Sequence, residues 1–142
     1  MLVDANLLLY ATDHSSLHYE ASRRWLETVL QRNRRVGFPW QSIGAFLRVS
    51  TNPRVFARPI TSAQAWSQVH RWLDAPPAWI PPATERTAAV LGELIVTHHV
   101  TANLVPDAML AALAIENGLT IMSADTDFAR FGEARWENPL AG

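Results

Sequence analysis

Cysteine and lysine are both absent from this chain of 142 residues. Without cysteine, the protein has no disulfide framework, no thiolate chemistry and no cysteine-based zinc site. All 12 basic residues are arginines, which excludes lysine-based catalysis. The glycine-rich phosphate loop is excluded as well, because its lysine is the residue that reaches the phosphates.

Charge of either sign is scarce. The formal net charge is −1 and 18% of the residues are charged. Bulk positive charge therefore cannot attract a polyanion to this protein. Any contact with nucleic acid must come from local patches of arginine.

Long hydrophobic runs are missing too. The longest uninterrupted apolar run covers residues 108–115, which is 8 residues, whereas a membrane-spanning helix needs about 20. Asp4 also stands where a signal peptide would carry basic and then apolar residues. We therefore expect a cytoplasmic protein without a membrane segment.

Apolar residues are nevertheless plentiful, at 49% of the chain, which predicts a single domain over residues 1–142 with a packed core. Short strands are expected at 2–3, 36–38, 79–80, 120–122 and 135–137. Helices are expected at 21–30, at 40–49, from 61–62 to the break at 75–77, at 84–98 and at 106–117. Strands that alternate with helices predict an α/β fold. We expect a three-layer α/β/α domain with a short central parallel sheet of four to five strands.

The six tryptophans are numerous for this length. Trp66, Val69 and Leu73 recur at intervals of three and four, so Trp66 is expected to face the core. Trp72 lies off this stripe. An exposed tryptophan would be free to stack on RNA bases or to anchor a partner protein.

Aspartates gather where the expected elements meet. Asp4 follows the first strand, Asp125 and Asp127 follow the strand at 120–122, and Asp107 lies in the first turn of the helix at 106–117. Sites of open parallel sheets lie beyond the carboxyl ends of the strands. Carboxylates held together there repel unless a cation neutralises them. Mg²⁺ does so with oxygen ligands, activates water and stabilises phosphodiester charge, so the cluster favours phosphodiester hydrolysis.

Each acid also has a purely structural explanation. Asp4 can form an Asx turn, Asp107 can oppose a helix dipole, and Asp125 or Asp127 can cap residues 128–131. Taken singly, each of these explanations accounts for its residue. They do not explain why four acids converge on one edge of the sheet.

Four stretches, in their order and spacing, resemble a known family. They are Val3–Asn6, Phe46–Pro53, Val105–Ala114 and Ser123–Phe128. Together they resemble the PIN-domain ribonucleases, and within them the VapC-type toxins of bacterial toxin–antitoxin pairs. The resemblance implies a metal-dependent endoribonuclease that hydrolyses RNA phosphodiester bonds, inhibits translation and is neutralised by a cognate VapB-like antitoxin. It further implies a homodimer.

The resemblance also assigns roles to individual residues. Asp4 and Asp107 match the principal metal ligands, and Asp125 matches the later acid that orients the metal or its water. Asn6 and Ser123 match polar positions that support the first and last acids. The implied cofactor is Mg²⁺, with Mn²⁺ as the alternative.

One acid of the family pattern is missing. The family carries a glutamate, followed by leucine, on the helix after the second strand, and Phe46 is taken here as the matching place. Asp127 is a secondary candidate that would take the place of the missing acid, in a site that holds one metal rather than two. The loss motivates an alternative, a weakened or inactive PIN-like module that acts through binding RNA or its antitoxin.

Arginine has a planar group that suits phosphate oxygens, and Arg48 and Arg54 are the candidates for RNA contact. Arg32, Arg34 and Arg35 are ascribed instead to the favourable field at the end of the preceding helix.

Two rival functions lack residues that they require. A receiver domain needs a lysine, which is absent here. An aspartate-nucleophile phosphatase uses a second acid two residues after the first, and Asp4 has none there.

Overall fold

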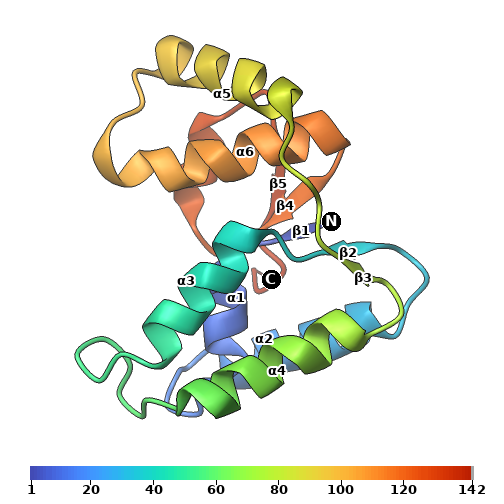
Figure 1. Cartoon of the computed structure of the whole chain (residues 1–142), viewed down its shortest axis with the longest axis vertical. Helices are drawn as coiled ribbons and strands as arrows, with labels where there is room; N and C mark the ends of the chain where they lie inside the picture. The colour runs from blue at the N-terminus through green and yellow to red at the C-terminus, as the bar shows by residue number, and fades with distance from the viewer. Residues whose placement is uncertain (142) are drawn as a thin grey trace.

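Five short parallel strands form the centre of the molecule. The structure is a computed structural model and describes residues 1–141. The strands are arranged in the order β3-β2-β1-β4-β5 (Figure 1). Their bounds are β1 Leu2–Val3, β2 Val36–Gly37, β3 Ala78–Trp79, β4 Thr120–Met122 and β5 Arg135–Glu137. The predicted α/β class and parallel sheet are confirmed, with five strands.

The central strand shows why the sheet is covered on both faces. Leu2 pairs with Ile121, and both belong to one hydrophobic core, whereas Val3 pairs with Met122 in the other. Neighbouring side chains of a strand point to opposite faces. One apolar dipeptide therefore contributes to two cores, which is the three-layer arrangement that the sequence predicts.

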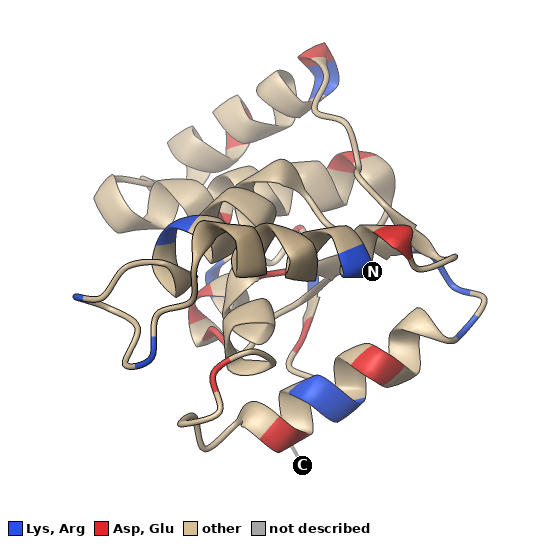
Figure 2. Ribbon diagram, turned by 60° about the horizontal axis from the view of Figure 1, so that its bottom comes forward, with Lys and Arg blue, Asp and Glu red and all other residues tan. Residues whose placement is uncertain are grey.

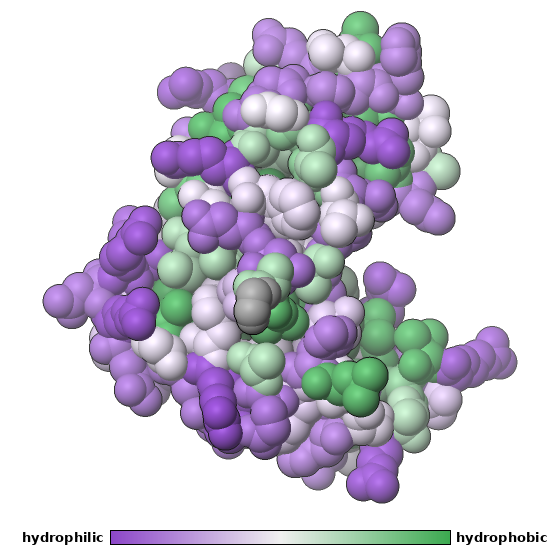
Figure 3. All heavy atoms as spheres, turned by 180° about the vertical axis from the view of Figure 1, so that it is seen from behind, coloured by the Kyte–Doolittle hydropathy of each residue, from purple (hydrophilic) through white to green (hydrophobic). Residues whose placement is uncertain are grey.

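Helices cover the two faces in separate groups. Helices α1 to α4 contribute to the core on one face of the sheet, and α5 and α6 contribute to the core on the other face (Figure 1). Their bounds are α1 Ala5–Tyr10, α2 Tyr19–Leu30, α3 Trp40–Ser50, α4 Ser62–Asp74, α5 Glu85–His98 and α6 Val105–Asn117, with short 3₁₀ turns η1 at Ala102–Leu104 and η2 at Thr126–Arg130. From behind, the surface is hollowed between the part built from α5 and α6 and the part below it (Figure 3).

Local signals explain where the long helices begin and end. Thr61 and Thr84 each form a capping box with the residue three positions later, which satisfies backbone donors of the first turn. α6 carries proline in its first turn and ends at Gly118, whose φ of 64° is the left-handed conformation that favours glycine. The predicted limits of these helices are therefore close to the observed ones.

One helix was not predicted, and one predicted helix face is wrong. Residues 5–10 form helix α1, which the sequence pattern does not reveal because six residues are too few to show a helical period. On α4 the buried face is Ala65, Val69 and Trp72, so Trp72 is 7% exposed and Trp66 is 50% exposed. The rings of Phe38 and Phe46 pack against Trp72, and this contact selects a stripe other than the one predicted.

Charged residues are spread over many of the helices and loops (Figure 2). On α2, Arg23 contacts Glu20 at 3.1 Å and Glu27 at 2.7 Å. These pairs follow the i,i+3 and i,i+4 spacing of a helix surface.

No helix within residues 1–141 combines the length and the apolar character that crossing a bilayer requires.

Candidate functional site

Asp4 lies where the central strand ends. Its backbone N–H donates to the carbonyl of Met122, and its Oδ1 accepts the N–H of Ala5, at 2.8 Å, as the N-cap of α1. Its Oδ2 accepts the hydroxyl of Ser123 at 2.7 Å. Burial raises the pKa of Asp4, the bonds from Ser123 and Ala5 oppose this, and the charge of Asp125 adds to it. The cap and the site role therefore coexist in one side chain.

Ser123 is the centre of a network that joins β1 to β4. While it donates to Asp4, its hydroxyl oxygen accepts the Asn6 amide and the Asp125 backbone N–H, each at 3.0 Å. Ser123 is fully buried. A buried hydroxyl with all its partners holds them in one arrangement. Of the two polar positions predicted to support the acids, Ser123 thus bonds Asp4 directly, and Asn6 bonds Ser123.

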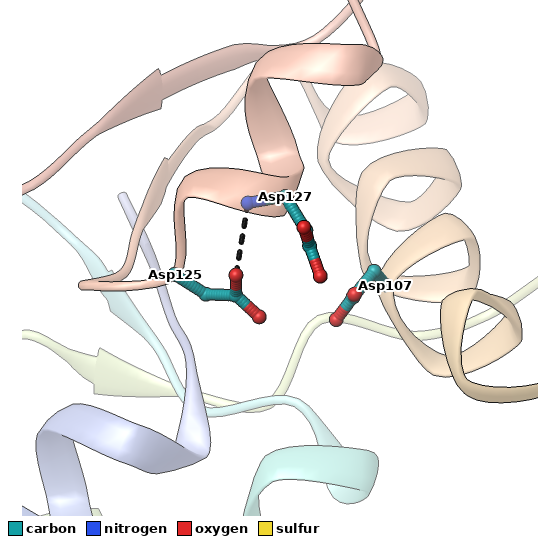
Figure 4. Close-up of side chains that lie close together, drawn as sticks. All are labelled: Asp107, Asp125 and Asp127. Atoms are coloured by element: carbon teal, nitrogen blue, oxygen red, sulfur yellow. Dashed lines mark hydrogen bonds between the residues drawn. The ribbon is translucent and has the colours of Figure 1, made fainter.

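Three other acids face one another beside this network. Asp107 comes from the first turn of α6, and Asp125 and Asp127 come from the loop after β4 (Figure 4). One carboxylate oxygen from each lies within 4.8 Å of the others. Asp125 is also the N-cap of η2 and accepts the backbone N–H of Asp127 at 2.8 Å. The secondary candidate Asp127 is therefore part of this group, whereas Asp4 is not one of its three members.

Burial and neighbouring negative charge act together on Asp107. Burial raises its pKa to about 6, and the charges of Asp125, Asp4 and Asp127 add to the effect in that order. Ionised carboxylates at such distances repel one another unless a cation lies between them. All four predicted acids therefore share one electrostatic environment.

A small cavity connects Asp4 to Asp107. Its volume is about 80 Å³, and its walls come from α1, α3 and α6. On the α3 side it is lined by Gln41, Ser42 and Ala45. Ser42 is buried, and its hydroxyl donates to the Val3 carbonyl at 2.7 Å, which fixes the start of α3 against β1. No sequence signal pointed to Gln41.

The position expected to carry the missing acid needs correction. Phe46 has no exposed surface and packs edge-to-face on Trp72, with ring centroids 4.9 Å apart, so it faces the core. Its neighbour Ala45, by contrast, lines the cavity with Asp4 and Asp107. A helical step of about 100° separates neighbouring side chains. The α3 wall of the cavity thus carries no carboxylate.

The two arginines predicted to contact RNA lie elsewhere. Arg48 is in the last turn of α3 and Arg54 in the loop after it, and both are exposed. Neither lines the cavity, which is at the first turns of α3. Their contact with RNA stays a prediction.

The donor atoms suit a hard divalent cation. Within residues 1–141 the acids Asp107, Asp125 and Asp127 offer carboxylate oxygens only, and neither histidine nor cysteine joins them. Oxygen-only sets suit Mg²⁺ or Mn²⁺ rather than zinc. The raised pKa of Asp107 indicates negative charge that such an ion would relieve.

Comparisons with known proteins found similar sequences over almost the whole chain. The profile of a family described as PIN domain matches residues 1–134. Ribonuclease VapC37 from Mycobacterium tuberculosis is 44% identical over 140 residues, 99% of this chain and 97% of that protein. Ribonuclease VapC43 from the same organism is 37% identical over 142 residues, 100% of this chain and 97% of that protein.

Solved structures show the same fold. VapC20 from Mycobacterium tuberculosis, described as a sarcin-ricin loop cleaving toxin, has a TM-score of 0.69 at 17% identity and covers 94% of this chain and 98% of its own. VapBC-1 from nontypeable Haemophilus influenzae has a TM-score of 0.71 at 12% identity, covering 99% of this chain and 98% of that one. At these identities the likeness concerns the fold.

Proposed function

Because this chain belongs to the PIN-domain family, we propose that it is a metal-dependent endoribonuclease of the VapC type. It hydrolyses RNA phosphodiester bonds and thereby inhibits translation. The observation that carries this proposal is the group of three carboxylates within 4.8 Å, on a chain 44% identical to a protein named a ribonuclease. We further propose that residues 1–142 act as one domain, since β1 lies in the sheet between β2 and β4, two strands that are far apart in the chain.

Asp4, Asp107 and Asp125 would hold Mg²⁺ or Mn²⁺, and Asp127 would supply a further oxygen. A bound ion of this kind lowers the pKa of water and stabilises negative charge on a phosphate. The chain's own contribution is orientation. Ser123 and the Ala5 N–H hold both oxygens of Asp4.

Below about pH 6, ion binding at Asp107 requires the loss of a proton. With a pKa raised to about 6, its carboxyl is ionised at neutral pH and protonated in mild acid. A carboxyl must lose its proton before it can ligate a metal. Affinity for the ion should therefore fall as the pH drops below about 6.

A partner protein is part of the proposal. Structures with this fold include VapBC complexes, among them VapBC2 from Rickettsia felis bound to a DNA fragment from its promoter. We infer that a small VapB-like antitoxin neutralises this chain, and that the toxin forms a homodimer. Trp40, which begins α3, and Met109, in the second turn of α6, are large and exposed. They offer apolar surface near the cavity for such contacts.

The test is cleavage of a mixed RNA substrate by the purified protein with Mg²⁺, with Mn²⁺ and with EDTA. Cleavage should require the metal and should be lost in Asp4→Ala. Asp74→Ala is the matched control, because Asp74 is exposed at the end of α4, and it should cleave at the wild-type rate. Cleavage that persists in EDTA or in Asp4→Ala would refute the proposal.

A second candidate function rests on Ala45. Because α3 brings no carboxylate to the cavity, the chain could instead be an inactive module that acts by binding RNA or its antitoxin. Metal-dependent cleavage by the pure protein excludes this alternative. Binding of RNA and antitoxin without cleavage would establish it.

A further inference from the structure

A basic pocket lies at the opposite edge of the sheet from the acids. Its volume is about 250 Å³, and no acidic residue contributes to its walls. It is lined by Met1, Arg34, Arg35, Gly118, Leu119, Thr120 and Arg135. Three of these side chains carry a permanent positive charge, because an arginine is not deprotonated in proteins.

The parallel sheet brings these residues together. Met1 precedes β1, Arg35 precedes β2, and Thr120 and Arg135 begin β4 and β5. In a parallel sheet the amino ends of all strands meet at one edge. Arg35 and Arg135 therefore converge across three pairs of strands, although about 100 residues separate them in the chain.

The three arginines lack counter-charges. Within residues 1–141 none of them forms an ion pair, whereas Arg23 and Arg24 on α2 are paired with Glu20. Like charges gathered on one surface repel one another. Such an arrangement is stabilised when an anion binds between them.

Helix stabilisation does not account for Arg34 and Arg35. Helix α2 ends at Leu30, and its last turn contains no basic residue. The dipole of a helix acts on charges within its last turn. Both arginines lie in the loop that joins α2 to β2, where Figure 2 shows arginine in blue, so the explanation that the sequence favoured does not hold for these two.

Two of the guanidinium groups are held in place. The guanidinium carbon of Arg35 lies 3.8 Å from the centre of the Trp79 ring. Arg135 donates through Nη2 to the Gly118 carbonyl at 2.6 Å. Both side chains remain exposed. A planar group with several N–H donors matches the oxygens of a phosphate, and side chains already fixed lose less entropy when they bind one.

We propose that Arg34, Arg35 and Arg135 form a second site for the RNA substrate, which binds its phosphate backbone. The inference rests on the ribonuclease function proposed above. The net charge of the chain is −1, so attraction for RNA phosphates away from the proposed metal site depends on local groups of arginine such as this one. The two edges are about 10 Å apart along β1, and because helices cover both faces of the sheet, an RNA strand that reaches both edges passes around the outside of the domain.

The shape of the pocket favours a backbone over a free nucleotide. It is shallow, its three arginines are exposed, and its volume is smaller than that of most small-molecule sites, about 300–1,000 Å³. A chain that passes over the surface needs no enclosure, and each phosphate needs only one or two guanidinium groups.

The experiment measures binding of a fluorescein-labelled single-stranded RNA by anisotropy. The full chain carries Asp107→Asn to prevent cleavage, and the arginine variant adds Arg34→Gln, Arg35→Gln and Arg135→Gln. The dissociation constant should rise about tenfold, and the slope of log affinity against log salt should shrink by about one to two. Arg32→Gln is the matched control, since Arg32 lies on the same loop but does not line the pocket. It should change affinity less than about twofold.

Two further variants keep the test decisive. Arg34→Glu alone should weaken binding without affecting the fold, because the Arg34 side chain is exposed and makes no hydrogen bond within residues 1–141. Replacing all three arginines by lysine should restore most of the salt dependence. RNA affinity that stays at the level of the Arg32→Gln control would overturn the proposal. Tighter, equally arginine-dependent binding of duplex DNA would overturn it as well.

Cleavage assays separate this site from the function it rests on. With Asp107 intact, the triple glutamine variant should raise KM for RNA and leave kcat unchanged. If the protein cleaves no RNA while the variant still loses binding, the nuclease function fails and the site stands. If cleavage is normal and the variant changes neither KM nor affinity, the site fails and the function stands.

Discussion

Replacing Asp107 by asparagine should stabilise the metal-free protein while abolishing its activity. The carboxylate of Asp107 is held within 4.8 Å of those of Asp125 and Asp127, and burial together with these neighbours raises its pKa from 3.8 to about 6. Asparagine occupies the same volume without the charge. The substitution therefore removes repulsion from the folded state and leaves the packing in place.

The magnitude follows from the pKa shift. About two pK units correspond to about 3 kcal/mol of free energy that folding spends on keeping Asp107 ionised. Asp107 is partly exposed to solvent, so screening reduces this to about 1 kcal/mol. For a chain of this length, 1 kcal/mol is a rise in Tm of about 2–4 °C.

The dependence on pH has a definite sign. Between about pH 4 and 6 the unfolded state has lost the proton of Asp107 and the folded state still keeps it, so the stability of the wild type falls as the pH rises. Above about pH 6 both states are ionised and the full cost is present. The advantage of Asp107→Asn should therefore be largest near about pH 8 and much smaller near about pH 4.5.

Urea unfolding in EDTA at the two pH values measures this difference. Glu93→Gln is the control, because Glu93 is exposed on α5 and forms no ion pair within residues 1–141. It should change stability by less than about 0.5 kcal/mol at either pH. The reasoning fails if Asp107→Asn is no more stable than the wild type near pH 8, or if its gain is equal at both pH values. Added Mg²⁺ should stabilise the wild type more than the variant.

Four further substitutions test the site and the core. Ala45→Glu should place a carboxylate at the cavity and raise Mn²⁺ affinity about three- to tenfold by calorimetric titration; unchanged affinity would show that Ala45 does not face the ion. Ser123→Ala removes the hydrogen bond that lowers the pKa of Asp4, so NMR titration should find that pKa raised, and urea unfolding a loss of about 1–3 kcal/mol. Trp72→Ala should cost about 3–5 kcal/mol in urea unfolding, whereas the half-exposed Trp66→Ala should cost under about 1 kcal/mol; equal costs would contradict the packing described for α4.

Local chemistry made much of the fold predictable. The caps at Thr61 and Thr84 and the left-handed Gly118 act through neighbouring backbone groups, so their effect can be read within a few residues. The alternation of strands with helices then limits the topology to a parallel sheet covered on both faces. The carboxyl ends of its strands are where Asp4 and Asp125 were expected and where they lie.

Packing between distant segments decided what the sequence left open. Whether Phe46 or Ala45 faces the acids depends on how α3 is rotated against the sheet, and the contact of Phe46 with Trp72 sets that rotation. The same contact turns α4 so that Trp72 is buried. Neither orientation can be read from one helix, because the partner that selects it lies elsewhere in the chain.

The sequence by itself determined the class of fold, the limits of its long helices and the set of acids, because these depend on short-range patterns. Only the tertiary structure showed that one oxygen each of Asp107, Asp125 and Asp127 lies within 4.8 Å of the others, in a group that does not include Asp4. Only it gathered Arg34, Arg35 and Arg135 into one pocket. The physical reason is strand order. With β1 and β4 placed between β2 and β5, residues far apart in the chain share an edge of the sheet, and their charges act on one another through space.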